Sequence, residues 1–209
     1  MSTSREILLI RHGTTDANLI RSFTGKGDIP LNEQGMQEAA ALRFRSELRG
    51  ADRYWSSPML RVRQTAGQAL GAELPLHIDE RLREADFGDW EGRIFDDIVA
   101  TETEAVARWR RGDADFAFPG GESIHDFFVR TSQAADAILA TPGEGHIVVF
   151  THGGVIRSLV SYWLGLGRLH FFRFEARNTS VTRLKVYPDS YGALVTLNDC
   201  THLDHAKAG

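Results

Sequence analysis

The stretch Ile7-Leu8-Leu9-Ile10-Arg11-His12-Gly13 decides how this chain is expected to fold. Four consecutive apolar residues, followed closely by a glycine, are typical of a strand buried on both faces, as in a parallel sheet. A similar segment follows 140 residues later, where Ile147-Val148-Val149-Phe150 precedes Thr151-His152-Gly153. Ligand sites of open parallel sheets lie outside the carboxyl ends of the strands. We therefore expect His12 and His152 to be neighbours.

Helical patterns alternate with such strands. Asn32 can cap a helix that runs to about Leu48, and Ser57 followed by Pro58 predicts the start of a helix that reaches Leu70. Further elements are predicted from apolar spacing: a strand over 51–56, a helix over 124–140, a helix buried along one side after Gly154, and a hairpin of strands over 180–187 and 193–198. This alternation predicts an α/β fold, a three-layer sandwich with a mostly parallel central sheet flanked by helices.

Residues 85–122 break the alternation and carry several large aromatic side chains among charges and glycines. We interpret this segment as a small helical cap insertion within a single domain that spans residues 1–209. The aromatic residues are expected to pack the cap onto the core, although stacking against a ring in a substrate stays open. They are Trp90, Trp109, Phe116 and Phe118.

Composition excludes several classes of function. The 24 Lys and Arg residues against 28 Asp and Glu residues give a net charge of −4, so a nucleic-acid partner is not expected. No apolar run approaches the roughly 20 residues of a membrane-spanning helix, so no membrane partner is expected either. One cysteine, Cys200, permits no internal disulfide and indicates a reducing compartment. We expect a cytoplasmic protein.

The residues around His12 suggest phosphate chemistry. A histidine just beyond a buried strand has a fixed backbone, and its neutral imidazole can act as a nucleophile. Arg11 offers a planar set of donors that matches phosphate. Arg61 lies near the start of a predicted helix, where free N–H groups favour an anion, whereas Arg63 lies about 200° around that helix. Only one of them can easily face a shared site, and we choose Arg61, partly on the resemblance that follows.

Four separated blocks resemble the histidine phosphatase superfamily, which includes cofactor-dependent phosphoglycerate mutases and many small-molecule phosphatases. The blocks are Arg11-His12-Gly13, Ser57-Pro58-x-x-Arg61, Glu84 and Thr151-His152-Gly153. The resemblance extends from Ile7 to about Asn198 and includes the segment 25–35, where Lys26 replaces a tryptophan common in relatives. Asn178-Thr179-Ser180 resembles a late family segment with a structural role.

The resemblance implies a role for each matching residue. His12 is the nucleophile that becomes a phosphohistidine, and Glu84 is the proton donor to the leaving alkoxide if burial or substrate charge keeps it protonated. Arg11, Arg61 and His152 form the charged phosphate clamp, with His152 protonated and His12 neutral. Further phosphate or substrate contacts are expected from Asn18, Thr24, Gly25 and Gly153. No metal and no cofactor is required.

Two segments favour the phosphatase branch. Residues 80–92 resemble the corresponding block of α-ribazole phosphatase and its relatives, and residues 118–123 also resemble phosphatases, whereas Trp109-Arg110-Arg111 resembles a mutase segment. The expected function is metal-independent hydrolysis of a small-molecule phosphomonoester. A phosphoglycerate mutase-type transfer, a phosphoprotein substrate and a non-catalytic phosphate-binding module remain as alternatives.

Two weaker signals lie late in the chain. Cys200, His202 and His205 have a spacing that is poor for structural zinc, so no metal site is expected there. The aromatic residues Phe171, Phe172 and Phe174 belong either to the core or to a contact between copies, which leaves a homodimer open.

Overall fold

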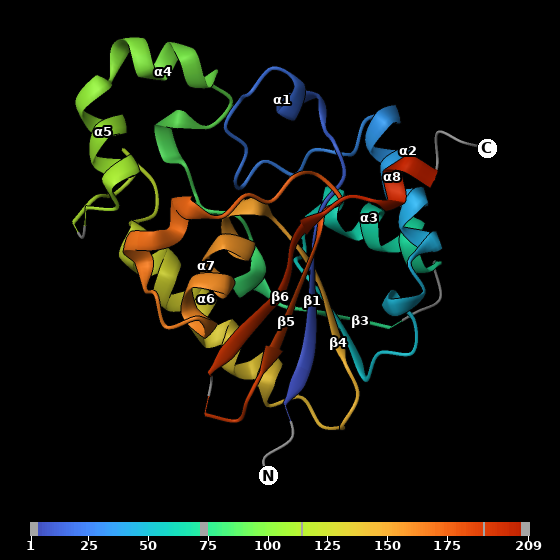
Figure 1. Ribbon diagram of the computed structural model, residues 1–209. Coiled ribbons are helices and arrows are strands. Elements are labelled where there is room, and N and C mark those ends of the chain that lie inside the picture. The colour runs from blue at the N-terminus through green and yellow to red at the C-terminus, as the bar shows by residue number, and fades with distance from the viewer. Residues whose placement is uncertain (1–3, 72–74, 114, 190, 206–209) are drawn as a thin grey trace.

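A six-stranded sheet forms the centre of the computed structural model, which describes residues 4–71, 75–113, 115–189 and 191–205 (Figure 1). The strands are β1 (Arg5–Arg11), β2 (Arg53–Ser56), β3 (Leu76–Ile78), β4 (Ile147–Thr151), β5 (Val181–Val186) and β6 (Gly192–Asp199). Their order across the sheet is β3-β2-β4-β1-β5-β6. Strands β3, β2, β4 and β1 run parallel, and β5 and β6 are antiparallel, which confirms the mostly parallel sheet and the hairpin near the C-terminal end of the described chain.

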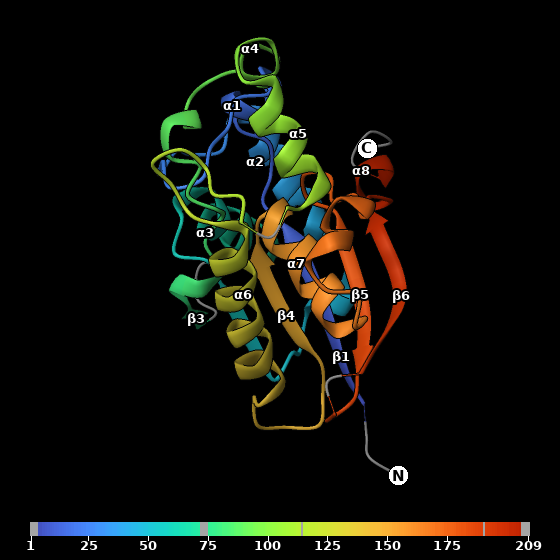
Figure 2. The same cartoon turned by 90° about the vertical axis from the view of Figure 1, so that its left-hand side faces the viewer.

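Helices cover both faces of the sheet, so the three-layer α/β prediction is confirmed (Figures 1 and 2). One face carries α2 (Glu33–Ala41), α3 (Leu60–Leu70) and α8 (His202–His205), and the other carries α6 (Ile124–Leu139) and α7 (Gly153–Trp163). The remaining helices are α1 (Asp16–Leu19), α4 (Phe95–Thr101) and α5 (Thr103–Arg111), with 3₁₀ helices η1 (Leu42–Phe44), η2 (Ser46–Leu48), η3 (Glu80–Leu82), η4 (Gly88–Trp90) and η5 (Arg168–Arg173).

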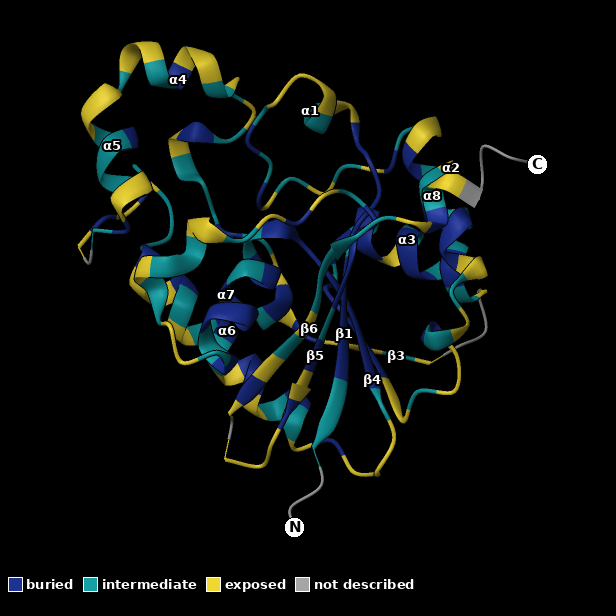
Figure 3. Cartoon of the chain, in the orientation of Figure 1, coloured by how far each residue is buried: buried dark blue, intermediate teal, exposed yellow. Residues whose placement is uncertain are grey.

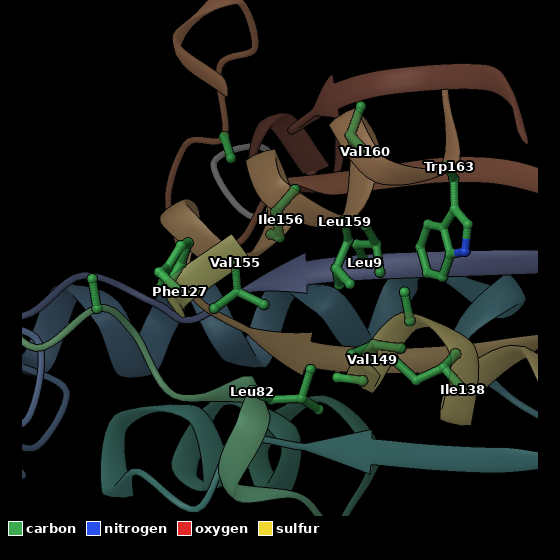
Figure 4. Close-up of a cluster of buried hydrophobic side chains, with 14 of the residues drawn as sticks. Leu9, Leu82, Phe127, Ile138, Val149, Val155, Ile156, Leu159, Val160 and Trp163 are labelled. Carbon is green, nitrogen blue, oxygen red and sulfur yellow. The ribbon is translucent and has the colours of Figure 1, made fainter. Parts of the chain in front are cut away.

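Successive side chains of β1 point to opposite faces of the sheet and so belong to two separate layers of the core. Ile7 and Leu9 pack with α6 and α7, whereas Leu8 and Ile10 pack with α3 on the opposite face. All four side chains are fully buried, which is why the segment reads as a continuous apolar run rather than an alternating one. Figure 4 shows Leu9 between the side chains that α7 contributes to the first layer, and Figure 3 shows that burial extends along the central strands.

Three details of the predicted helices are wrong. The helix capped by Asn32 ends at Ala41 rather than Leu48, because Arg45 adopts an extended backbone and only short 3₁₀ turns follow. The next helix begins at Leu60, with Met59 as its N-cap, and the Ser57 hydroxyl bonds to His152 and to the Met59 N–H rather than to an N–H within the helix. Helix α7 is buried around most of its circumference rather than along one side, because the sheet, α6 and η5 all pack against it.

Most of residues 85–122 lies beyond the carboxyl ends of the parallel strands, beside α1 (Figures 1 and 2). Trp90, Phe116 and Phe118 are buried and belong to the same core cluster as α6 and α7, so the expected packing of these side chains is confirmed. Trp109 is partly buried and packs against that cluster. Within the described residues, no helix combines the length and apolar character needed to cross a membrane.

Candidate active site

The two histidines that follow parallel strands lie side by side, as the sequence predicts. The register of β1 and β4 pairs Arg11 with Thr151, so the next residue of each strand leaves the sheet at the same edge. The His12 backbone N–H donates to the Thr151 carbonyl at 3.0 Å, which fixes the first ring relative to β4. The ring centroids of His12 and His152 lie 5.2 Å apart in an edge-on arrangement.

The His12 imidazole is held in the tautomer that a nucleophile requires. Its Nδ1 lies 2.8 Å from the Gly13 carbonyl oxygen, and because a carbonyl only accepts, Nδ1 carries the hydrogen. In the neutral ring the lone pair is therefore on Nε2. The pKa of His12 lies well below the ordinary 6.5, because the ring is buried and because Arg11 and Arg61 disfavour a further positive charge.

The expectation of a protonated His152 is wrong for this structure. The pKa of His152 also lies well below 6.5, because the ring is completely buried and Arg61, His12 and Arg11 repel a proton. Its Nε2 lies 2.9 Å from Ser57 Oγ, and its Nδ1 is buried without a hydrogen-bond partner among the described residues. If Ser57 donates to Nε2, the neutral ring still carries a hydrogen on Nδ1.

The two arginines are held by different means. Arg11 donates to the Ala176 carbonyl at 2.7 Å, and its Nε is buried with no hydrogen-bond partner among the described residues. Burial lowers the pKa of Arg11 to about 10, so the side chain remains cationic at neutral pH. Arg61 is 1% exposed and donates to the Gly27 and Gly25 carbonyls at 2.8 and 3.0 Å, so its guanidinium holds the loop over residues 24–27.

Glu84 is fixed against the first turn of α7. Gly154 N–H donates to its Oε2 at 2.9 Å, and Ala85 N–H donates to its Oε1 at 3.1 Å. A Cβ at Gly154 would lie 2.2 Å from the Glu84 Oε1, so glycine is required at Gly154 for this close approach. The α7 N-terminus thus orients the carboxyl group toward the cavity that His12 also lines.

A cavity of about 350 Å³ brings most of the candidate residues together. It is lined by Arg11, His12, Asn18, Arg21, Ser22, Phe23, Thr24, Glu84, Phe87, Phe95 and Asn178. Arg61, His152, Gly25 and Gly153 do not line it. Gly25 is bound through its N–H by the Glu91 carboxylate and through its carbonyl by Arg61, and a Cβ at Gly153 would meet the Arg11 side chain at 3.4 Å.

Sequence reasoning missed three residues that support the site. Ser57 carries the bond to His152, but its position before Pro58 favoured a helix cap instead. Asn178 lines the cavity, and its Nδ2 donates to the His12 carbonyl at 3.0 Å and to Asn18 Oδ1 at 3.1 Å. Glu91 accepts from the Gly25 and Lys26 backbones and so ties the loop to residues 85–91; no local pattern distinguishes it from a surface acid.

The structure offers no metal-binding cluster within the residues it describes: no three His, Cys, Asp or Glu side chains come close enough together. His202 is buried and bonds to Thr179, while Cys200 is partly buried. The side chain of His205 lies outside the described residues.

Comparison with known proteins places this arrangement in a family of phosphoryl-transfer proteins. The model of the histidine phosphatase superfamily (branch 1) matches residues 7–200. The chain belongs to this superfamily.

Named relatives include both phosphatases and a mutase. The chain is 33% identical over 210 residues to a probable phosphoglycerate mutase GpmB of Salmonella paratyphi C, covering 95% of each chain. The α-ribazole phosphatase from Shigella flexneri is similar in structure, with a TM-score of 0.83, 25% identity, and coverage of 93% of this chain and 96% of that one. The mycobacterial glucosyl-3-phosphoglycerate phosphatase gives a TM-score of 0.80 with 29% identity, over 93% and 98% of the two chains.

Proposed function

We propose that this protein is a metal-independent phosphatase that hydrolyses a small-molecule phosphomonoester through a phosphohistidine on His12. One observation carries the proposal: His12, Arg11 and the Glu84 carboxyl group line one cavity at one end of the sheet, and the charge of Arg61 is close enough to lower the pKa of His12. A phosphate-binding module would need the arginines but neither the nucleophile nor the acid, so the full set favours an enzyme.

The first chemical step uses the tautomer fixed by Gly13. The Nε2 lone pair of His12 attacks phosphorus, and the bond from phosphorus to the ester oxygen breaks. Arg11 stabilises negative charge on the phosphoryl oxygens, and Asn18 adds an uncharged donor. His152 lies behind His12 and, with Ser57 donating to its Nε2, contributes the hydrogen on its Nδ1. Arg61 contributes positive field from behind the loop over residues 24–27, whose Thr24 contacts the substrate. Glu84 donates its proton to the leaving alkoxide, which departs as the alcohol.

The second step returns the enzyme to its starting state. Ionised Glu84 accepts a proton from water, the resulting hydroxide attacks phosphorus, and the bond from phosphorus to His12 Nε2 breaks. Phosphate leaves and Glu84 is protonated again.

A mutase activity is the second candidate, because the curated relatives at 33% identity are named probable phosphoglycerate mutases. The α-ribazole phosphatase likeness in structure favours hydrolysis and makes an α-ribazole-type phosphate one substrate to test. Both reactions would share the phosphohistidine and differ in whether water or a second substrate hydroxyl accepts the phosphoryl group.

The decisive experiment measures product identity in EDTA. Purified protein should release inorganic phosphate from p-nitrophenyl phosphate with EDTA present and should form an acid-labile phosphoprotein on rapid quenching. His12→Ala should abolish both while circular dichroism stays unchanged. With 3-phosphoglycerate, free phosphate supports the phosphatase and the 2-phospho isomer supports the mutase. Activity that EDTA removes and added metal restores, or a fully active His12→Ala protein, would overturn the proposal.

The same assay tests whether Glu84 donates the proton to the leaving group. Glu84→Gln keeps the shape of the side chain but cannot donate a proton, so it should slow alkyl phosphates by about 100-fold or more, and p-nitrophenyl phosphate much less. Equal slowing of both substrates would exclude the acid role.

A further inference from the structure

A second, smaller cavity adjoins the cavity of His12. It measures about 150 Å³ and shares Phe23, Glu84 and Phe87 with the larger one. Because the Glu84 carboxyl group lies at the junction, a substrate whose ester oxygen receives the Glu84 proton has its phosphate on one side. The alcohol portion then extends toward the smaller cavity.

Aromatic rings dominate the smaller cavity. Its other lining residues are Ala85, Trp109, Phe118, Ile124, Phe127, Gly154, Arg157 and Phe171. Phe87 packs edge-on against Phe118 with ring centroids 5.0 Å apart, and against Phe23 at 4.9 Å, so packed aromatic rings form the walls. An apolar cavity of about 150 Å³ accommodates a benzene-sized group.

Arg157 is the only cation among the side chains that line this pocket. It lies on α7, its Nε donates to the Phe174 carbonyl at 2.9 Å, and its guanidinium carbon lies 6.0 Å from the centre of the Phe171 ring. Within the described part of the chain, no carboxylate oxygen comes within 4.0 Å of its nitrogens. Burial lowers the pKa of Arg157, although the charges of Glu84 and Glu175 act in the opposite direction. A partly desolvated cation that lacks an ion pair favours an anionic ligand group.

We propose that this aromatic pocket binds the leaving alcohol and that Arg157 pairs with an anionic substituent on it; this inference rests on the proposed phosphatase function. The substrate class is a phosphomonoester of a compact, ring-sized, mainly apolar alcohol that carries a carboxylate. A carboxylate suits the site because its two oxygens match the planar guanidinium and because its small size leaves room for the ring. A polyol phosphate would place hydroxyl groups among phenyl rings without hydrogen-bond partners and is therefore disfavoured.

Three phosphate esters test both halves of the proposal: benzyl phosphate, 4-carboxybenzyl phosphate and glycerol 1-phosphate. For the wild-type protein, kcat/KM on benzyl phosphate should exceed that on glycerol 1-phosphate by about tenfold or more, the effect of burying one aromatic ring. The carboxylated ester should exceed benzyl phosphate by about tenfold, the effect of one charged hydrogen bond. Equal values for benzyl and glycerol phosphates overturn the aromatic pocket, and equal values for the two benzyl esters overturn the pairing with Arg157.

Variants of Arg157 separate charge recognition from structural support. Arg157→Met should reduce the ratio of kcat/KM for carboxybenzyl over benzyl phosphate to about one. Arg157→Lys should restore much of that ratio, although it cannot restore the bond from Nε to Phe174. Arg63→Met removes the same charge from the exposed side of α3 and should keep the wild-type ratio.

The outcomes distinguish a failure of the Arg157 proposal from a failure of the proposed phosphatase function. A ratio that stays above tenfold in Arg157→Met overturns the pairing, as does an equal loss on both esters, which would assign Arg157 to the phosphate or to helix positioning. In each case phosphate release continues and the phosphatase proposal stands. A wild-type protein that hydrolyses p-nitrophenyl phosphate but none of the three esters overturns this inference alone, whereas a protein that hydrolyses none of the four esters overturns both.

Discussion

At the scale of single residues, burial rather than sequence position determines the protonation state of the site. His12 and His152 are 5% and 0% exposed, and each lies in the field of Arg11 and Arg61. The penalty for placing another positive charge in this environment keeps both rings neutral. The surroundings therefore favour the neutral form of both rings, which is the form of His12 that the proposed nucleophilic attack requires.

This protonation state predicts a pH dependence. Because the pKa of His12 lies well below 6.5, its ring should remain neutral as the pH falls through 6.5, and protonation should begin only at lower pH. Ring ¹³C or ¹⁵N shifts, assigned with His12→Asn, would follow this directly. A midpoint near 6.5 would contradict the prediction.

The same shift has a consequence for stability. Below pH 6.5 His12 and His152 become protonated in the unfolded chain but stay neutral in the folded protein. The free energy of unfolding should therefore decrease as the pH falls from 6.5 toward the lower pKa values of the two folded histidines.

At the scale of elements, Gly154 sets the distance between the α7 N-terminus and the Glu84 carboxyl group. Gly154 N–H donates to Glu84 at 2.9 Å, and no other residue type permits this approach without moving the carboxylate. Helix α3 offers the opposite case, since a Cβ at Gly67 would meet no atom within 4 Å. The contact between α7 and Glu84 therefore depends on the missing Cβ of Gly154, whereas nothing in α3 depends on the missing Cβ of Gly67.

These two glycines form a matched pair of alanine substitutions. Gly154→Ala should displace the Glu84 carboxylate and lower kcat/KM on alkyl phosphates by about 10- to 100-fold, with little loss of stability because only the end of a side chain must move. Gly67→Ala should raise the free energy of unfolding by up to about 1 kcal/mol through helix propensity and leave kcat/KM unchanged. Steady-state kinetics and urea unfolding give both quantities. Normal activity in Gly154→Ala would show that the contact with Glu84 is dispensable.

At the scale of the whole molecule, a chain with net charge −4 concentrates buried positive charge at one edge of its sheet. The Arg11 Nε and the His152 Nδ1 are both buried without hydrogen-bond partners among the described residues. Such groups are costly in the folded protein, and an anion that satisfied them would offset that cost.

Phosphate should therefore stabilise the fold by mass action. At about 100 times its Kd, inorganic phosphate should add about 2.7 kcal/mol and raise the Tm by about 5–10 °C for a chain of this length. Differential scanning fluorimetry in phosphate, with chloride at equal ionic strength as control, measures the shift. Arg11→Met should lose most of it, and a shift of wild-type size in that variant would assign the phosphate to another site.

Sequence patterns predicted the α/β class, the central strands and the adjacency of His12 and His152, because runs of buried apolar residues and parallel pairing are local or topological properties. They missed Ser57 and Glu91, whose partners lie 95 and 66 residues away in His152 and Gly25. The aromatic pocket beside Arg157 was also missed, since its walls come from segments of the chain that are spread between Phe23 and Phe171.

Residue types and their order by themselves determined the fold class, the family and the candidate nucleophile. Only the tertiary structure decided which nitrogen of His12 carries its hydrogen, whether His152 is charged, and how Glu84 lies between two cavities. The physical reason is that desolvation, charge–charge interaction and cavity shape depend on distances between segments, which one-dimensional patterns do not contain.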